Sequence, residues 1–150
     1  MKITLAFQHT DPKDETFLGK IMSFLIKKWT KSKYFHVECI IDDIWVSMKP
    51  GTTLEFNKLK ELNSLYDYVD INIDGRKNHK VLNFLHSKQG EKYDWFGIVF
   101  SQIIDINLDD RDKWYCSELI TQVLRLYEYK KFKDLKDNLL SPEEVYQLLK

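Results

Sequence analysis

Residues 34–49 carry the pattern that constrains the fold of this chain most. Two runs, Tyr34 to Ile41 and Ile44 to Lys49, alternate with a period of two and are joined by Asp42-Asp43. This pattern predicts a β-hairpin in which the two-residue loop sets Ile41 opposite Ile44. One face, which we expect to be the core face, is then apolar throughout: Val37, Cys39, Ile41, Ile44, Val46 and Met48. The other face places an imidazole, a carboxylate and a hydroxyl together, in the set His36, Glu38, Ile40, Trp45, Ser47 and Lys49.

The remaining segments group strands early in the chain and helices late. Hydrophobic periodicity predicts strands at 2–8, 52–56 and 65–73, and helices at 15–29, 76–88, 93–104 and 116–129. A last helix is predicted from Ser141-Pro142-Glu143-Glu144, which has a capping serine, proline at the first position and glutamate three after the cap. This order predicts an α+β fold with an antiparallel sheet of about five strands, in one domain over residues 1–150.

Charge and cysteine content narrow the classes of function. The 23 Lys and Arg residues balance the 23 Asp and Glu residues, whereas nucleic-acid binders usually carry a basic excess, so we expect no nucleic-acid partner. Two cysteines are too few for a disulfide scaffold. The N-terminal apolar run is short for a signal peptide, and no stretch is apolar for long enough to span a membrane. We therefore expect a cytoplasmic protein with no membrane insertion.

Cys116 is the candidate nucleophile. It stands at the predicted start of a helix whose apolar periodicity begins at Leu119, after a loop at 107–112. The positive end of a helix dipole and the free N–H groups of the first turn stabilise a thiolate, and the same N–H groups can receive an oxyanion. The alternative reading is a small inert core residue, because free cysteine is often buried.

His36 is the candidate base, and Glu38 and Ser47 are the candidates for the group that orients its ring. A nucleophilic cysteine and its histidine meet in space and not in sequence, so the offset of 80 positions from His36 to Cys116 is no obstacle. The predicted hairpin sets Glu38 opposite Ser47 on the face of His36, and either side chain could take the third position. A zinc site through His36 and Cys116 lacks further ligands, so no metal or other cofactor is predicted.

These residues resemble a known family. Phe35-His36-Val37-Glu38 on a strand, followed later by Trp114-Tyr115-Cys116-Ser117-Glu118-Leu119, is similar to the circularly permuted branch of the NlpC-type papain-like cysteine peptidases. That branch includes the YiiX/YaeF-like hydrolases, the lecithin:retinol acyltransferase-like proteins and small bacteriophage homologues. In permuted members the histidine strand precedes the cysteine helix, as it does here. The stretch 92–97 also resembles the Tyr-x-Trp-Gly segment that precedes the cysteine in this superfamily.

The resemblance covers roughly residues 1–145 and implies a permuted papain-like fold in which Cys116 is the nucleophile and His36 the base. It also implies that Tyr93 lies beside the active site, and Trp114 and Tyr115 are candidates for the wall of the substrate cleft. The activity implied is acyl transfer to water or another acceptor, on a peptide, amide or other acyl substrate. A bacteriophage homologue would work in the host cytoplasm.

Alternative functions remain open at this stage. Relatives include lipid acyltransferases as well as peptidases and amidases, so a lipid or thioester acyl hydrolase or acyltransferase is the alternative to amide or peptide hydrolysis. A binding protein that retains the fold without catalysis is a second class. A redox-sensing thiol is a third, which needs a resolving cysteine, and Cys39 on the predicted core face is poorly placed for that role.

Overall fold

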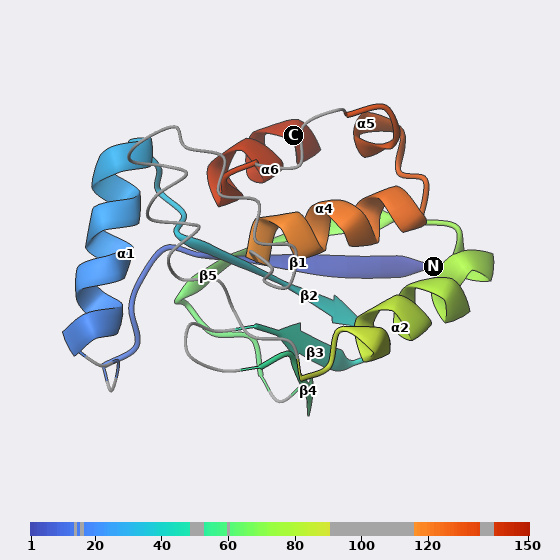
Figure 1. The fold of residues 1–150 in the computed structure, drawn as a ribbon, viewed down its shortest axis with the longest axis horizontal. Helices are drawn as coiled ribbons and strands as arrows, with labels where there is room; N and C mark the ends of the chain where they lie inside the picture. The colour runs from blue at the N-terminus through green and yellow to red at the C-terminus, as the bar shows by residue number, and fades with distance from the viewer. Residues whose placement is uncertain (14, 16, 49–52, 60, 91–115, 136–139) are drawn as a thin grey trace.

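A five-stranded antiparallel sheet forms the centre of the molecule (Figure 1). The structure is a computed structural model and describes residues 1–13, 15, 17–48, 53–59, 61–90, 116–135 and 140–150. The strands are β1 (Lys2–Gln8), β2 (His36–Ile41), β3 (Ile44–Ser47), β4 (Glu55–Lys58) and β5 (Tyr66–Asn72). Their order in the sheet is β4-β3-β2-β1-β5, so β1 pairs with both β2 and β5. The predicted α+β class and antiparallel sheet are confirmed.

The β2–β3 hairpin has the predicted register. Ile41 lies opposite Ile44, and the pairing continues through Ile40 with Trp45. Asp42 and Asp43 take positive φ angles of 49° and 61°, the conformation of a two-residue type I′ turn, which aspartate tolerates better than most residues.

One expectation about this hairpin is wrong. Ile44, expected in the core, is exposed because it follows the turn directly at the end of the hairpin. In addition, every residue of β2 is buried, so the face with His36 and Glu38 is covered as well as the apolar face.

The helices supply the apolar cover of the sheet. They are α1 (Phe17–Thr30), α2 (Asn78–Ser87, preceded by the 3₁₀ turn η1 at Gly75–Lys77), α4 (Cys116–Leu126), α5 (Lys130–Lys133) and α6 (Pro142–Leu149). Figure 1 shows α4 and α6 lying across the sheet, while α1 stands apart from them at its side. Helix α4 buries Leu119, Ile120, Val123 and Leu124 in the core. No helix in the described ranges has the length and apolar character needed to cross a bilayer.

The fourth strand begins later than the sequence predicts, and two predicted segments lie outside the described residues. A strand was expected at 52–56, but β4 begins at Glu55 because it pairs with β3 from Ser47 opposite Glu55 to Ile44 opposite Lys58. The pairing with β3, and not the local sequence pattern, therefore determines where β4 begins and ends. The predicted helix at 93–104 and loop at 107–112 lie outside the described residues. The predicted start of α6 is confirmed, with both hydrogen bonds of a capping box between Ser141 and Glu144.

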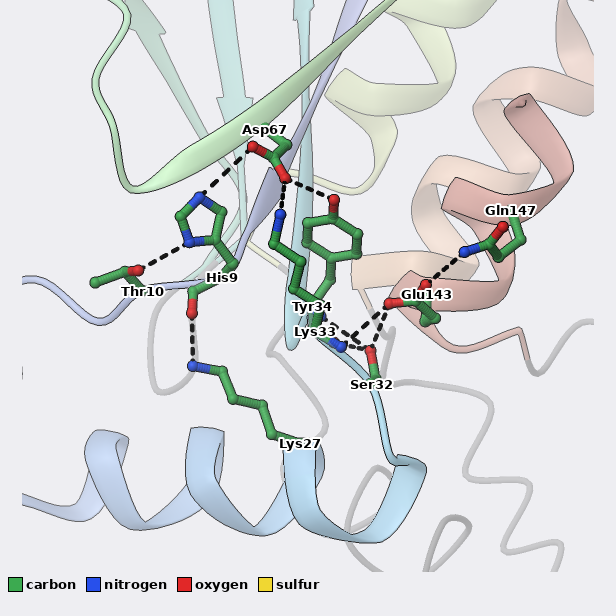
Figure 2. Close-up of polar contacts among 9 residues, drawn as sticks. All are labelled: His9, Thr10, Lys27, Ser32, Lys33, Tyr34, Asp67, Glu143 and Gln147. Carbon is green, nitrogen blue, oxygen red and sulfur yellow. Dashed lines mark hydrogen bonds and ion pairs between the residues drawn. The ribbon is translucent and has the colours of Figure 1, made fainter.

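Polar contacts fix the segment that leads into β2 (Figure 2). The Tyr34 hydroxyl and the Lys33 ammonium both donate to the Asp67 carboxylate of β5, the former over 2.6 Å. The backbone N–H of Lys33 and the hydroxyl of Ser32 donate to Glu143 of α6, each over 3.2 Å. These contacts hold the chain between a strand and a helix immediately before His36, so they determine where the first residue of β2 lies.

Candidate active site

Cys116 is the first residue of α4 and is buried. It belongs to the hydrophobic core cluster, and the helix it opens lies against β2. Cys116 is thus the first described residue of a helix, and the residue before it lies outside the described part of the chain.

His36 is the first residue of β2, and its imidazole hydrogen-bonds the Cys116 side chain. The other contact of the ring is with Glu38, whose Oε1 lies 3.1 Å from His36 Nε2. The Glu38 carboxylate therefore holds the Nε2 side of the ring. The structure thus brings together a thiol, an imidazole and a carboxylate in a linear order.

Glu38 is a buried carboxylate, only 1% exposed, and it is supplied with donors. In addition to His36, Trp45 Nε1 donates to its Oε2 over 2.6 Å, and the Tyr66 hydroxyl also donates to it. The ring of Trp45 stands edge-on to Tyr66, with centroids 5.3 Å apart, and edge-on to Tyr68, at 6.3 Å. A carboxylate out of water is tolerated when its oxygens are hydrogen-bonded in this way.

The electrostatics of the site favour a charged imidazole. Burial lowers the pKa of His36, but hydrogen bonds and charge interactions with Cys116 and Glu38 outweigh burial and raise this pKa to about 10. His36 therefore keeps its proton throughout the neutral range. An imidazolium placed between a thiol and a carboxylate is the arrangement that stabilises a thiolate.

Cys39, the other cysteine, lies on the opposite face of β2 from Glu38 and His36, because neighbouring residues of a strand point to opposite sides. Burial, together with the negative charge of Glu38, raises the pKa of its thiol to about 12. It is a core residue, as predicted from its place on the apolar face.

The predicted site residues divide into three groups. His36, Glu38 and Cys116 are in contact. Ser47 is buried in β3, and the same register carried one step beyond Cys39 and Val46 sets it opposite Glu38, but among the described residues no hydrogen bond joins it to His36 or Glu38. Three further predicted residues lie outside the described part of the chain: Tyr93, Trp114 and Tyr115.

Sequence reasoning missed the two aromatic donors to Glu38. Trp45 stood on the predicted face of His36 and Glu38, and its indole N–H was the available signal, since a buried indole usually finds an acceptor. Tyr66 had no such signal. Its approach to Glu38 depends on the strand order, in which Gln8 of β1 pairs with Tyr66 on one side and His36 on the other.

Comparison of the sequence with protein-family models and with curated proteins finds no match. Within the described residues, no three His, Cys, Asp or Glu side chains gather in a group that could hold a metal ion.

Proposed function

We propose that this protein is a cysteine hydrolase that transfers an acyl group through Cys116, with an amide or peptide bond as its substrate. The observation that carries the proposal is the contact of a helix-opening thiol with a buried histidine whose second nitrogen is held by a carboxylate. Nucleophile, base and orienting group in this order are the arrangement used for covalent acyl transfer.

The permuted papain-like layout is part of this proposal. In support of it, the histidine is on an early strand and the cysteine opens a late helix that lies against that strand, which is the order implied by the sequence resemblance. The third position is assigned to Glu38, because its carboxylate contacts His36 while Ser47 does not.

Each step of the reaction follows from these positions. The Cys116 thiolate attacks the carbonyl carbon, and N–H groups in the first turn of α4 receive the negative charge that develops on the oxygen. His36 gives its proton to the leaving amine as the C–N bond breaks, which leaves a thioester on Cys116. His36 then takes a proton from water, the hydroxide attacks the thioester, and the C–S bond breaks to return the thiolate. Glu38 stays ionised and stabilises the imidazolium at each stage.

Labelling with acyl electrophiles tests the proposal. We expect a panel of small amide-, ester- and thioester-type probes to acylate or alkylate Cys116 in the wild-type protein, with no labelling of Cys116→Ala and strongly reduced labelling of His36→Ala. Small probes are appropriate because Cys116 is buried. Cys39→Ala is the matched control and should label like the wild type. Labelling that persists undiminished in His36→Ala would contradict the proposed pair, and a preference for ester or thioester probes would overturn the assignment to amide substrates.

A further inference from the structure

Helix α1 presents large apolar side chains to solvent. Phe17 is 82% exposed, Phe24 60% and Ile21 37%. These positions are separated by four and three residues, so they share one face of the helix. Among the described residues six large hydrophobic side chains are exposed, and three of them are these. The exposed apolar surface is therefore concentrated on one helix face and is not scattered singly.

The same face is basic. Lys20 lies three residues after Phe17 and Lys28 lies four after Phe24, so both belong to this face, and Lys31 follows the end of the helix. All three lysines are exposed, and within the described ranges none of them forms an ion pair. The sequence has no Asp or Glu from 16 to 37, although the whole chain has a net charge of zero. This segment is a local positive region of a neutral protein.

Contacts at the edge of this face attach α1 to the rest of the protein. The Ser23 hydroxyl donates to Asp11 over 2.5 Å. Figure 2 shows the second contact, in which Lys27 Nζ donates to the carbonyl of His9 over 2.6 Å. Both partners belong to the segment that follows β1. Figure 1 shows α1 at the side of the sheet, away from α4 and α6. Phe17 and Phe24 stay exposed to solvent next to these contacts.

We propose that this α1 face, made of Phe17, Lys20, Ile21, Phe24, Lys28 and Lys31, adsorbs to the surface of an anionic lipid bilayer. Aromatic and aliphatic side chains enter the boundary between headgroups and acyl chains, while lysine stems extend so that their ammonium groups reach anionic headgroups. With 14 residues α1 is too short to span a bilayer, so it lies in the plane of the interface.

The mixture of lysine with exposed phenylalanine favours a bilayer over a protein partner. Protein–protein interfaces are depleted of lysine, because a buried ammonium without a matched carboxylate is costly. A bilayer interface imposes no such cost, since the lysine head stays in the hydrated headgroup layer beside the apolar contact.

Co-sedimentation of the full chain with vesicles tests this inference. We expect binding to vesicles that contain phosphatidylglycerol in phosphatidylcholine, little binding to pure phosphatidylcholine, and loss of binding as salt is raised. Phe17→Ser with Phe24→Ser should weaken partitioning by about tenfold or more. Each change among Lys20→Gln, Lys28→Gln and Lys31→Gln should weaken it about fivefold.

Matched controls distinguish adsorption through the α1 face from nonspecific hydrophobic or electrostatic binding to vesicles. Leu62→Ser removes an apolar side chain that is 56% exposed outside α1, and Lys130→Gln with Lys131→Gln removes exposed positive charge on α5. Both should bind like the wild type. Cys116→Ala should also bind like the wild type, because adsorption does not depend on the proposed hydrolase activity.

Several results would overturn the inference. No binding to anionic vesicles would do so, as would binding that the Phe17 and Phe24 changes leave unaltered while circular dichroism shows an intact fold. Self-association that requires Phe24, in the absence of vesicle binding, would assign the face to a second copy of the chain. Retention on an acidic peptide with no vesicle binding would assign it to a protein partner.

Discussion

The two cysteines of this protein are both buried, yet different charged groups surround them. Cys39 lies within β2 next to the negative charge of Glu38, and its pKa is raised to about 12. Cys116 opens α4 and hydrogen-bonds His36, whose own pKa is raised to about 10. The carboxylate of Glu38 acts on both thiols. It opposes ionisation of Cys39 directly, but it favours ionisation of Cys116 because the charge of His36 stands between them.

The comparison shows that burial alone does not decide whether a cysteine is inert. Removal from water disfavours any thiolate, and a cation in contact can reverse that effect. Here the cation is kept charged by a carboxylate that has its own donors, Trp45 and Tyr66. The difference between the two thiols therefore depends on a chain of contacts that ends at two aromatic side chains, and each member of that chain can be altered separately.

Removal of the imidazole should have the largest effect. In His36→Gln, Cys116 loses its cation and becomes an ordinary thiol with a pKa of about 8.5 or above, so we expect iodoacetamide to alkylate it about 30-fold more slowly at pH 7. Alkylation of Cys39 should not change. His79→Gln, at an exposed position of α2, is the control. An unchanged rate at Cys116 would show that the two cysteines do not differ in the way described.

Titration of His36 in the wild type and in Cys116→Ala tests the same interaction between His36 and Cys116, observed at the histidine. Histidine NMR signals should give a midpoint near the pKa of about 10. The midpoint should fall well below this value in Cys116→Ala, because one of the two partners that raise the pKa of His36 is removed while the burial that lowers it remains. Since this pKa is raised on folding, the stability it contributes is fully present below pH ~6.5 and is lost as pH rises through the folded pKa. A midpoint near 6.5 in the wild type would contradict the ion pair.

Glu38→Gln and Ser47→Ala decide which residue takes the third position. The first change removes the charge that supports the imidazolium, so we expect a lower pKa of His36 and slower alkylation of Cys116 at pH 7. Ser47→Ala should leave the rate within about twofold, the scale of a substitution without contact to the reacting group. The reverse ranking would transfer the third position to Ser47.

Trp45→Phe and Tyr66→Phe should have the smallest effect on reactivity. Each removes one donor to the buried Glu38 carboxylate, and the loss of one such hydrogen bond should lower the free energy of unfolding by about 1–3 kcal/mol. Chemical denaturation measures this change. Tyr68→Phe is the control, because the Tyr68 hydroxyl contacts the backbone of Asn63. Equal losses in all three variants would mean that Glu38 is not held by Trp45 and Tyr66 in particular.

The sequence predicted those parts of the site that depend on local patterns. Alternation over residues 34–49 was sufficient for the β2–β3 register, and the apolar periodicity that begins at Leu119 was sufficient to predict helix α4. The burial of Glu38 and the role of Tyr66 were not predictable. They arise because β5 and β2 both pair with β1, a choice of neighbours made between segments far apart in the chain.

The pH dependence of iodoacetamide alkylation at both cysteines, followed by peptide mass spectrometry in one wild-type sample, tests the central claim most directly. The claim is that His36 keeps Cys116 as a thiolate at neutral pH. It predicts that the alkylation rate at Cys116 is nearly constant between about pH 6.5 and about pH 9, a range that includes the ordinary pKa values of histidine (about 6.5) and cysteine (about 8.5). Cys39 should stay unreactive over the same range. A rate at Cys116 that rises about tenfold per pH unit up to the ordinary cysteine pKa would contradict it.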